Sequence, residues 1–215
     1  YVPNLAARAL SLGKTSIIAV VFPYVYDTIL SDPLVLRILE GVEAESSLRG
    51  YNILLSTPRV SPQGVDIHYQ KLLQSGYIDG IIAMDNVPFA SVIEPARQQN
   101  IPAVAVGQFH TDFRVKSDDR SGGFQLMEHV TSLGHQHIGI IGVPEKLHYS
   151  IQHRIAGLKS AAEKAGIDYT ALPRADGDFS TTSGSRCAAQ LLRGYPDLTA
   201  LVCLNDRMAM GVIQY

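Results

Sequence analysis

The chain has 215 residues, of which 46% are hydrophobic and 18% are charged, and its formal net charge is −2. This composition predicts one large or two small folded domains, and it excludes extensive disorder and a strongly basic nucleic-acid surface on this part of the protein. Cys187 and Cys203 lie in apolar stretches, which favours reduced core thiols in a cytoplasmic protein. No apolar run approaches the roughly 20 residues that cross a bilayer, and the start lacks the apolar centre of a signal peptide, so no membrane association is expected.

Apolar runs typical of buried strands alternate with segments of helical period along the chain. In chain order, the first half predicts a strand at 16–22, a helix at 34–48, a strand at 51–56, a helix at 66–74, a strand at 80–84, a helix at 89–99 and a strand at 103–107. After a polar interval at 109–116, the second half predicts a helix at 122–133, a strand at 137–142, helices at 152–165 and 183–192, a strand at 200–204 and a helix from 206 onward. Weaker strand signals lie near 115–116 and 172–176.

The repeated strand–helix order predicts an α/β fold of two doubly wound parallel-sheet lobes, similar to periplasmic binding proteins, with a ligand cleft between them. We place a leading segment and linker at 1–15, an N-terminal lobe at 16–113 and a C-terminal lobe at 114–215. The second lobe has only two clear strands and the chain stops within a helical pattern. We therefore expect this lobe to be incomplete and more protein to follow.

Open α/β sheets bind ligands beyond the carboxyl ends of their strands, and this rule indicates candidate residues without further knowledge. In the second lobe such positions are Asp118 and Asp119, the stretch 142–148, and Asn205 and Asp206. Two facing lobes would line a cleft with carboxylates, amides, an arginine and aromatic faces, which suits a sugar. Arg154 and Phe179 are weighed with Asp119 and Asp206 as candidates. Each residue also has a structural interpretation. Asp206 could cap a helix, Arg154 could be a surface residue in a first helical turn, Phe179 could anchor a loop in the core, and Asp119 could satisfy local backbone.

Other short motifs do not fit a phosphate-binding, metal-binding or catalytic site. Gly13-Lys14-Thr15 lacks the earlier glycine of a phosphate-binding loop and precedes a strand instead of following one. His135 and His137 have no cysteine or carboxylate cluster nearby, so no metal site is expected. There is no Gly-x-Gly-x-x-Gly and no Gly-x-Ser-x-Gly. The sequence therefore predicts no cofactor and no enzymatic activity.

Many short motifs, in order and spacing, resemble the lactose-repressor (LacI/GalR) family of bacterial transcriptional regulators. The resemblance runs nearly end to end. Its motifs are YVPNLAARAL at 1–10, LEGVE at 39–43, RGY at 49–51, DGII at 79–82, DDRSGG at 118–123, LGH at 133–135, RIAG at 154–157, GDF at 177–179 and NDRMAMG at 205–211.

This resemblance implies a role for the leading segment. In the family a hinge helix follows a DNA-binding headpiece and folds on the operator, and Leu10 matches the leucine that wedges into the minor groove. Asn4 and Ala7 match positions that lie along the groove. A segment this short is marginal as an isolated helix in water, which agrees with folding only on DNA. The headpiece and the C-terminal portion of the family are absent from this sequence.

The resemblance also implies ligand contacts at particular positions. Asp119, Arg154, Phe179 and Asp206 match effector-contacting sites, while His148 and Ser150 match positions that contact purine or sugar in relatives. The loop at 24–31 is longer than usual for the family, and Tyr24, Tyr26 and Pro33 are further candidates around it.

The sequence thus predicts the effector-binding core of a ligand-responsive transcriptional regulator, a repressor acting in the cytoplasm as a homodimer. Its effector is expected to be a sugar, with a purine or nucleoside as an alternative. The alternative from another class is a periplasmic-type sugar-binding protein of an uptake system. A headpiece before the chain would favour regulation, and a signal peptide or lipid anchor would favour transport.

Overall fold

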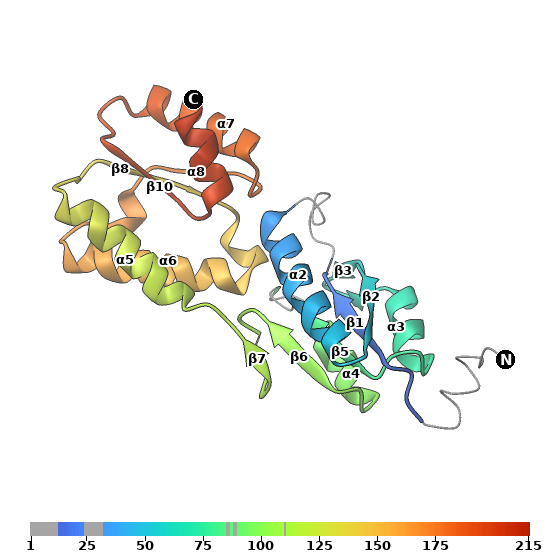
Figure 1. Ribbon diagram of the computed structural model, residues 1–215. Coiled ribbons are helices and arrows are strands. Elements are labelled where there is room, and N and C mark those ends of the chain that lie inside the picture. The colour runs from blue at the N-terminus through green and yellow to red at the C-terminus, as the bar shows by residue number, and fades with distance from the viewer. Residues whose placement is uncertain (1–12, 24–31, 85–86, 88–89, 110) are drawn as a thin grey trace. The chain divides into compact units, whose positions relative to one another are not determined.

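The computed structural model describes residues 13–23, 32–84, 87, 90–109 and 111–215. The chain forms two compact units, Tyr1–Lys116 and Ser117–Tyr215, which we call unit 1 and unit 2 (Figure 1). The division follows Lys116, slightly later than the boundary placed after residue 113 from the sequence. The two units are described separately below.

Unit 1 contains a five-stranded parallel sheet in the order β2-β1-β5-β6-β7. Non-consecutive neighbours in a parallel sheet require crossover connections, which helices supply. The four strands predicted here from apolar runs are present, each shorter by one or two residues than predicted. Their bounds are β1 Ile17–Val21, β2 Asn52–Ser56, β5 Gly80–Ala83 and β6 Ala103–Val106, and the fifth strand is β7 Arg114–Val115.

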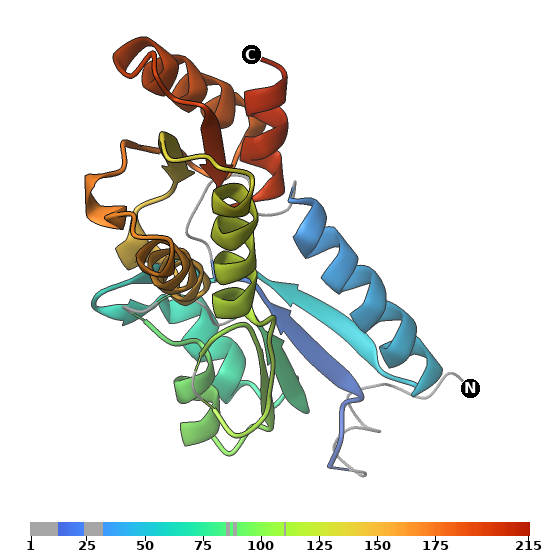
Figure 2. The ribbon, with the colours of Figure 1, turned by 90° about the vertical axis from the view of Figure 1, so that its left-hand side faces the viewer.

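Helices cover both faces of this sheet, as Figure 2 shows. Helix α2 (Pro33–Leu48) packs Val35 against Val20 and Phe22 of one face. On the other face, α3 (Ile67–Gln74) and α4 (Ile93–Gln98) bury apolar side chains against the alternate residues of β1, because successive strand side chains point to opposite faces. Unit 1 is therefore doubly wound, as predicted.

Three local features of unit 1 differ from the sequence prediction. A short hairpin of β3 (Val60–Ser61) and β4 (Gly64–Val65) was missed, because each strand is too short to show alternation. Helix α4 begins at Ile93 and not at residue 89 as predicted. The Ser91 hydroxyl accepts hydrogen bonds from the backbone amides of Ile93 and Glu94, at the start of the helix. The weak strand near 115–116, which we had assigned to the second lobe, is β7 and pairs with β6 in unit 1.

Unit 2 contains a three-stranded parallel sheet in the order β10-β8-β9. In Figures 1 and 2 the pair α5–α6 lies on one side of this sheet and the pair α7–α8 on the other. Its central strand is buried throughout, as expected for an apolar run covered by helices on both faces. The elements are α5 Asp119–Ser132, β8 Ile138–Gly142, α6 Tyr149–Lys164, β9 Arg174–Asp176, α7 Thr181–Gly194, β10 Ala200–Cys203 and α8 Asp206–Ile213, with 3₁₀ turns at Glu145–Leu147 and Tyr169–Ala171.

Glycines allow α5 and α6 to cross at backbone distance. A Cβ atom added at Gly157 would clash with the carbonyl oxygen of Arg120, and one added at Gly123 would clash with the carbonyl oxygen of Arg154. Carbonyl oxygens on a helix cannot move without breaking its hydrogen bonds, so neither site can accept a side chain without separating the helices. This close crossing determines how far the side chain of Arg154 stands from the start of α5.

Replacement of Gly157 by alanine is expected to destabilise the protein by about 1–3 kcal/mol, because overpacking forces the two helices apart. The matched control is Gly41→Ala, in the interior of α2, where no heavy atom lies within 4 Å of the added Cβ. That change should stabilise the protein by roughly 0.5–1 kcal/mol, since alanine restricts the unfolded chain more than glycine does. Urea unfolding of both variants measures the difference, and equal effects of the two changes would contradict the interpretation.

Candidate functional site

The carboxyl ends of the three strands of unit 2 lie along one edge of its sheet. The register pairs Cys203 with Ile141 and Gly142 with Asp176, so the strands end level with one another. We call the segments that follow them, residues 143–148, 177–180 and 204–206, together with the start of α5 and the first two turns of α6, the carboxyl edge of unit 2. Ligands of open parallel sheets bind at this kind of edge.

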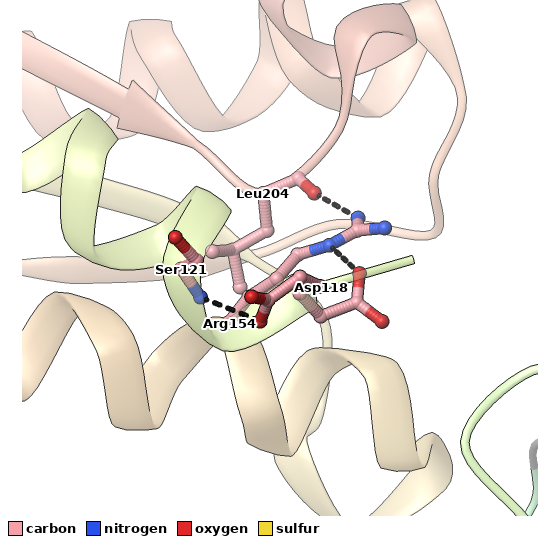
Figure 3. Close-up of polar contacts among 5 residues, drawn as sticks. Asp118, Ser121, Arg154 and Leu204 are labelled. Carbon is pink, nitrogen blue, oxygen red and sulfur yellow. Dashed lines mark hydrogen bonds and ion pairs between the residues drawn. The ribbon is translucent and has the colours of Figure 1, made fainter. Parts of the chain in front are cut away.

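Arg154 occupies the centre of the carboxyl edge (Figure 3). Its Nε donates a hydrogen bond to Oδ1 of Asp119 at 2.8 Å, and its Nη1 donates to the carbonyl oxygen of Leu204 at 2.7 Å. One guanidinium thereby joins α5, α6 and the residue that follows β10. The side chain of Asp119 is only 3% exposed, whereas that of Arg154 is 32% exposed. The Asp119 carboxylate is thus buried, and the Arg154 guanidinium that pairs with it is partly exposed at the surface.

The sequence placed Arg154 in the first turn of its helix, where a positive charge opposes the helix dipole. That placement is wrong, because α6 begins at Tyr149 and Arg154 lies in the second turn. The start of α5 is capped by Asp118, whose Oδ1 accepts the Ser121 amide at 3.1 Å. The cap of α5 is thus Asp118, and the next residue, Asp119, pairs with the arginine.

An aromatic pair lies beside this ion pair. The rings of His148 and Phe179 meet edge to face with centroids 5.3 Å apart. Phe179 has a φ of 69°, in the left-handed region that costs a non-glycine residue about 1–2 kcal/mol. Asn205 holds it there, because its Nδ2 donates to the carbonyl oxygen of Phe179 at 3.0 Å. Strain of this kind persists only where surrounding contacts determine the conformation, as they do at binding sites.

His148 has a lowered pKa of about 4, because burial disfavours the imidazolium and the nearby Arg154 guanidinium repels it. The ring is therefore neutral at pH 7. A neutral imidazole can donate from one ring nitrogen and accept at the other, which suits a hydroxyl or an amide of a ligand. The carboxyl edge thus presents a neutral imidazole beside a fixed guanidinium.

The structure gathers most of the sequence-predicted residues of the second lobe on the carboxyl edge. Ser150 is the second residue of α6 and half-buried. Asp206 is the exposed first residue of α8, and the capping role that we considered for it belongs to Asn205, whose Oδ1 accepts the Met208 amide at 3.1 Å. In unit 1, Pro33 is the exposed first residue of α2. The remaining candidates, Tyr24, Tyr26, Asn4, Ala7 and Leu10, lie outside the described residues.

Two contributors to the carboxyl edge were not chosen as site residues from the sequence. The first is the backbone carbonyl of Leu204, whose role no side-chain pattern can reveal. The second is Asn205, which follows a strand and precedes a helix, the position of a capping residue. Its side chain uses its oxygen as the cap and its nitrogen to hold Phe179.

Within the described part of the chain, no three histidine, cysteine or carboxylate side chains lie close enough together to hold a metal ion. Burial raises the pKa of the Cys203 thiol to about 11, so this thiol is a poor nucleophile at neutral pH. None of the helices in the described residues is both long and apolar enough to cross a membrane.

Arg154→Ala is expected to destabilise the protein by about 3–5 kcal/mol, because it removes the guanidinium that pairs with the buried Asp119 carboxylate. Adding Asp119→Asn should recover part of that loss, since the buried negative charge is then removed as well. The control is Arg37→Ala, which breaks an ion pair whose side chains are 82% and 67% exposed and should cost under about 1 kcal/mol. Urea unfolding measures all four proteins, and a similar cost for Arg154→Ala and Arg37→Ala would contradict a structural role for Arg154.

The neutral state of His148 predicts a loss of stability on acidification. In the unfolded chain His148 binds a proton with a pKa near 6.5, whereas in the folded protein it binds that proton only near pH 4. The free energy of unfolding should therefore fall as the pH drops from 6.5 toward 4, with a contribution of up to about 3 kcal/mol from this group. Subtracting the pH profile of a His148→Gln variant isolates the contribution, and parallel profiles would show that His148 titrates normally.

The comparisons with known proteins agree with the fold described above. Residues 127–215 match the model of a periplasmic binding protein-like domain. Over 222 aligned residues the chain is 29% identical to the HTH-type transcriptional regulator DegA of Bacillus subtilis, covering 100% of this chain and 63% of DegA. The chain thus spans less than two thirds of the length of this curated relative.

Two solved structures share the fold. One is a LacI family transcriptional regulator from Enterococcus faecium with bound ribose, which is 27% identical with a TM-score of 0.75 over 92% of this chain and 70% of that one. The other is a complex of the transcriptional regulator CelR with cellobiose, which is 22% identical with a TM-score of 0.77 over 97% of this chain and 66% of that one. By sequence along its whole length and by fold, this chain is similar to transcriptional regulators of the LacI family.

Proposed function

We propose that this chain is the effector-sensing core of a ligand-responsive transcriptional repressor, and that its effector is a sugar. The relatives that it matches are regulators, so an uptake protein or an enzyme has no support among them. Because the chain spans only part of those relatives, DNA binding is proposed for the whole protein. Ribose and cellobiose are ligands of the two solved regulators and indicate a class of compound, without naming the effector of this chain.

The observation that carries the proposal is the fixed guanidinium of Arg154. Two of its nitrogens are committed to Asp119 and Leu204, and its third nitrogen, Nη2, forms no hydrogen bond with the described residues. Arginine donors held in a rigid plane recognise oxygens at defined angles. Because the charge is already offset by a buried carboxylate, a neutral polyhydroxy ligand suits the site better than a multiply charged one.

The aromatic pair supports a sugar as well. The C–H face of a pyranose packs on an aromatic ring, and the half-buried Phe179 offers one at the carboxyl edge. The same ring and the neutral His148 could also stack on a base and bond to it. Purines and nucleosides are therefore the second candidate class.

Regulation requires that the effector discriminate between two states of the protein. A ligand shifts an equilibrium only by its difference in affinity for the two states. We propose that the whole protein acts in the cytoplasm as a homodimer, and that the effector alters its affinity for operator DNA. Contacts of Asn4, Ala7 and Leu10 with the minor groove remain predictions from the family resemblance.

Titration calorimetry of this chain against monosaccharides, disaccharides, nucleosides and purines tests the effector class. At least one sugar is expected to bind, and Asp206→Ala should weaken it at least about tenfold, the cost of a hydrogen bond to a charged group. Asp206 is exposed and its loss should change stability by under about 1 kcal/mol, so the variant remains folded.

The matched control is Asp197→Ala, an exposed acidic residue in the turn before β10, at the opposite edge of the same sheet. It should leave sugar affinity unchanged. A sugar that binds both variants with wild-type affinity would show that the carboxyl edge is not the site. Binding of a nucleoside or purine in place of any sugar would overturn the choice of effector class.

A further inference from the structure

The start of β1 is held by one carboxylate from a distant part of unit 1. Asp79, which immediately precedes β5, accepts hydrogen bonds from the Thr15 amide at 2.8 Å and the Thr15 hydroxyl at 2.9 Å, both on Oδ1. Its Oδ2 accepts the Ser16 amide at 2.8 Å. In addition, the Asp79 amide donates to the carbonyl oxygen of Ile17 at 2.8 Å. Four hydrogen bonds thus join residues 15–17 to a single residue more than sixty positions away.

The backbone that this carboxylate holds is strained. Ser16 has a φ of 56°, a left-handed conformation that costs a non-glycine residue about 1–2 kcal/mol. The bend is reinforced because the Thr15 hydroxyl accepts the Ile17 amide at 3.2 Å. The chain is therefore kept in a defined sharp bend at the point where the leading segment becomes the first core strand.

The carboxylate is charged at neutral pH. Burial acts to raise the pKa of Asp79, but the hydrogen bonds from Thr15 and Ser16 and the nearby Lys14 outweigh it, so the pKa lies below its usual value. Hydrogen bonds to a charged acceptor are shorter and stronger than neutral ones. The bend therefore has a strong and permanent acceptor.

We propose that Asp79 is a positioning residue that fixes the direction of the backbone at residues 15–17, where the leading segment joins the first strand of the sheet. Strands β1 and β5 are neighbours with Ile18 opposite Gly80, and a contact between their starts ties this bend to the centre of the sheet. The inference rests on the proposed function, in which that segment contacts DNA. A backbone direction that is already fixed before binding lowers the conformational entropy that the chain loses when it binds DNA.

A purely structural role is the competing explanation, and the chain offers a matched control for it. Asp66, also in unit 1, accepts the Tyr69 amide at 2.9 Å on Oδ1 and the Arg59 amide at 2.7 Å on Oδ2. Its pKa is likewise lowered by backbone hydrogen bonds against the effect of burial. Asparagine at either position places an NH₂ group against a backbone N–H, so both variants lose the same kind of bond.

Amide hydrogen exchange by NMR tests the bend itself in this chain. Asp79→Asn should lower the protection of the Thr15 and Ser16 amides at least about tenfold, because both donate directly to the carboxylate. Thr15→Val, which removes only the hydroxyl, should have a smaller effect in the same direction. Asp66→Asn should leave these amides unchanged. Equal protection in Asp79→Asn and the wild type would overturn the proposal.

The second arm uses the full-length protein and a DNA duplex that the wild type selects from a random pool. Asp79→Asn should bind this duplex at least about threefold more weakly than Asp66→Asn does, at one salt concentration. Equal affinities of the two variants would overturn the positioning role and leave the proposed function standing. Failure of the wild type to select any duplex would instead overturn the proposed function, and the positioning role with it.

Discussion

The carboxylate of Asp119 is buried, and a buried charge needs a partner. Arg154 provides an ion pair to it, and this pair joins several elements of unit 2. The two residues can meet only because glycines let α5 and α6 approach to backbone distance. The same guanidinium reaches the carbonyl of Leu204 and so aligns the end of β10 with both helices. The same side chain therefore stabilises unit 2 and offers the donors for the ligand recognition proposed above.

Strained backbone is held in the same way at two distant places. Phe179 and Ser16 both adopt a left-handed conformation that their side chains disfavour, and each is held by a polar side chain from another segment, Asn205 and Asp79 respectively. Among the described residues a third non-glycine residue in this region of φ, Asn100, is of a type that adopts it at little cost. A side chain that maintains an unfavourable backbone conformation indicates a position at which the orientation of the residue is important. One of them orients an aromatic ring, and the other orients the entry to the first strand.

The sequence predicted the strands and the doubly wound arrangement well, because buried parallel strands appear as continuous apolar runs. The prediction was less accurate for the first residues of helices, which depend on polar side chains. Helix α4 starts late because of the Ser91 hydroxyl, and α6 starts early, which moves Arg154 out of the first turn. β7 was assigned to the wrong sheet, since a two-residue strand carries no signal of its partner. Residue types at the ends of strands indicated the candidate site, because parallel order sends those ends to one edge.

What the sequence determined by itself is the class of fold, a resemblance to one family of regulators, and a set of polar and aromatic residues at one edge of the second sheet. Periodicity and motif spacing are local properties and can be read along the chain. The tertiary structure alone decided which of those residues meet. It gave the cap of α8 to Asn205 and left Asp206 exposed, paired Arg154 with a buried carboxylate 35 positions earlier, and joined Asp79 to Thr15. Such pairings depend on the packing distance between elements and on backbone carbonyls, neither of which residue order encodes locally.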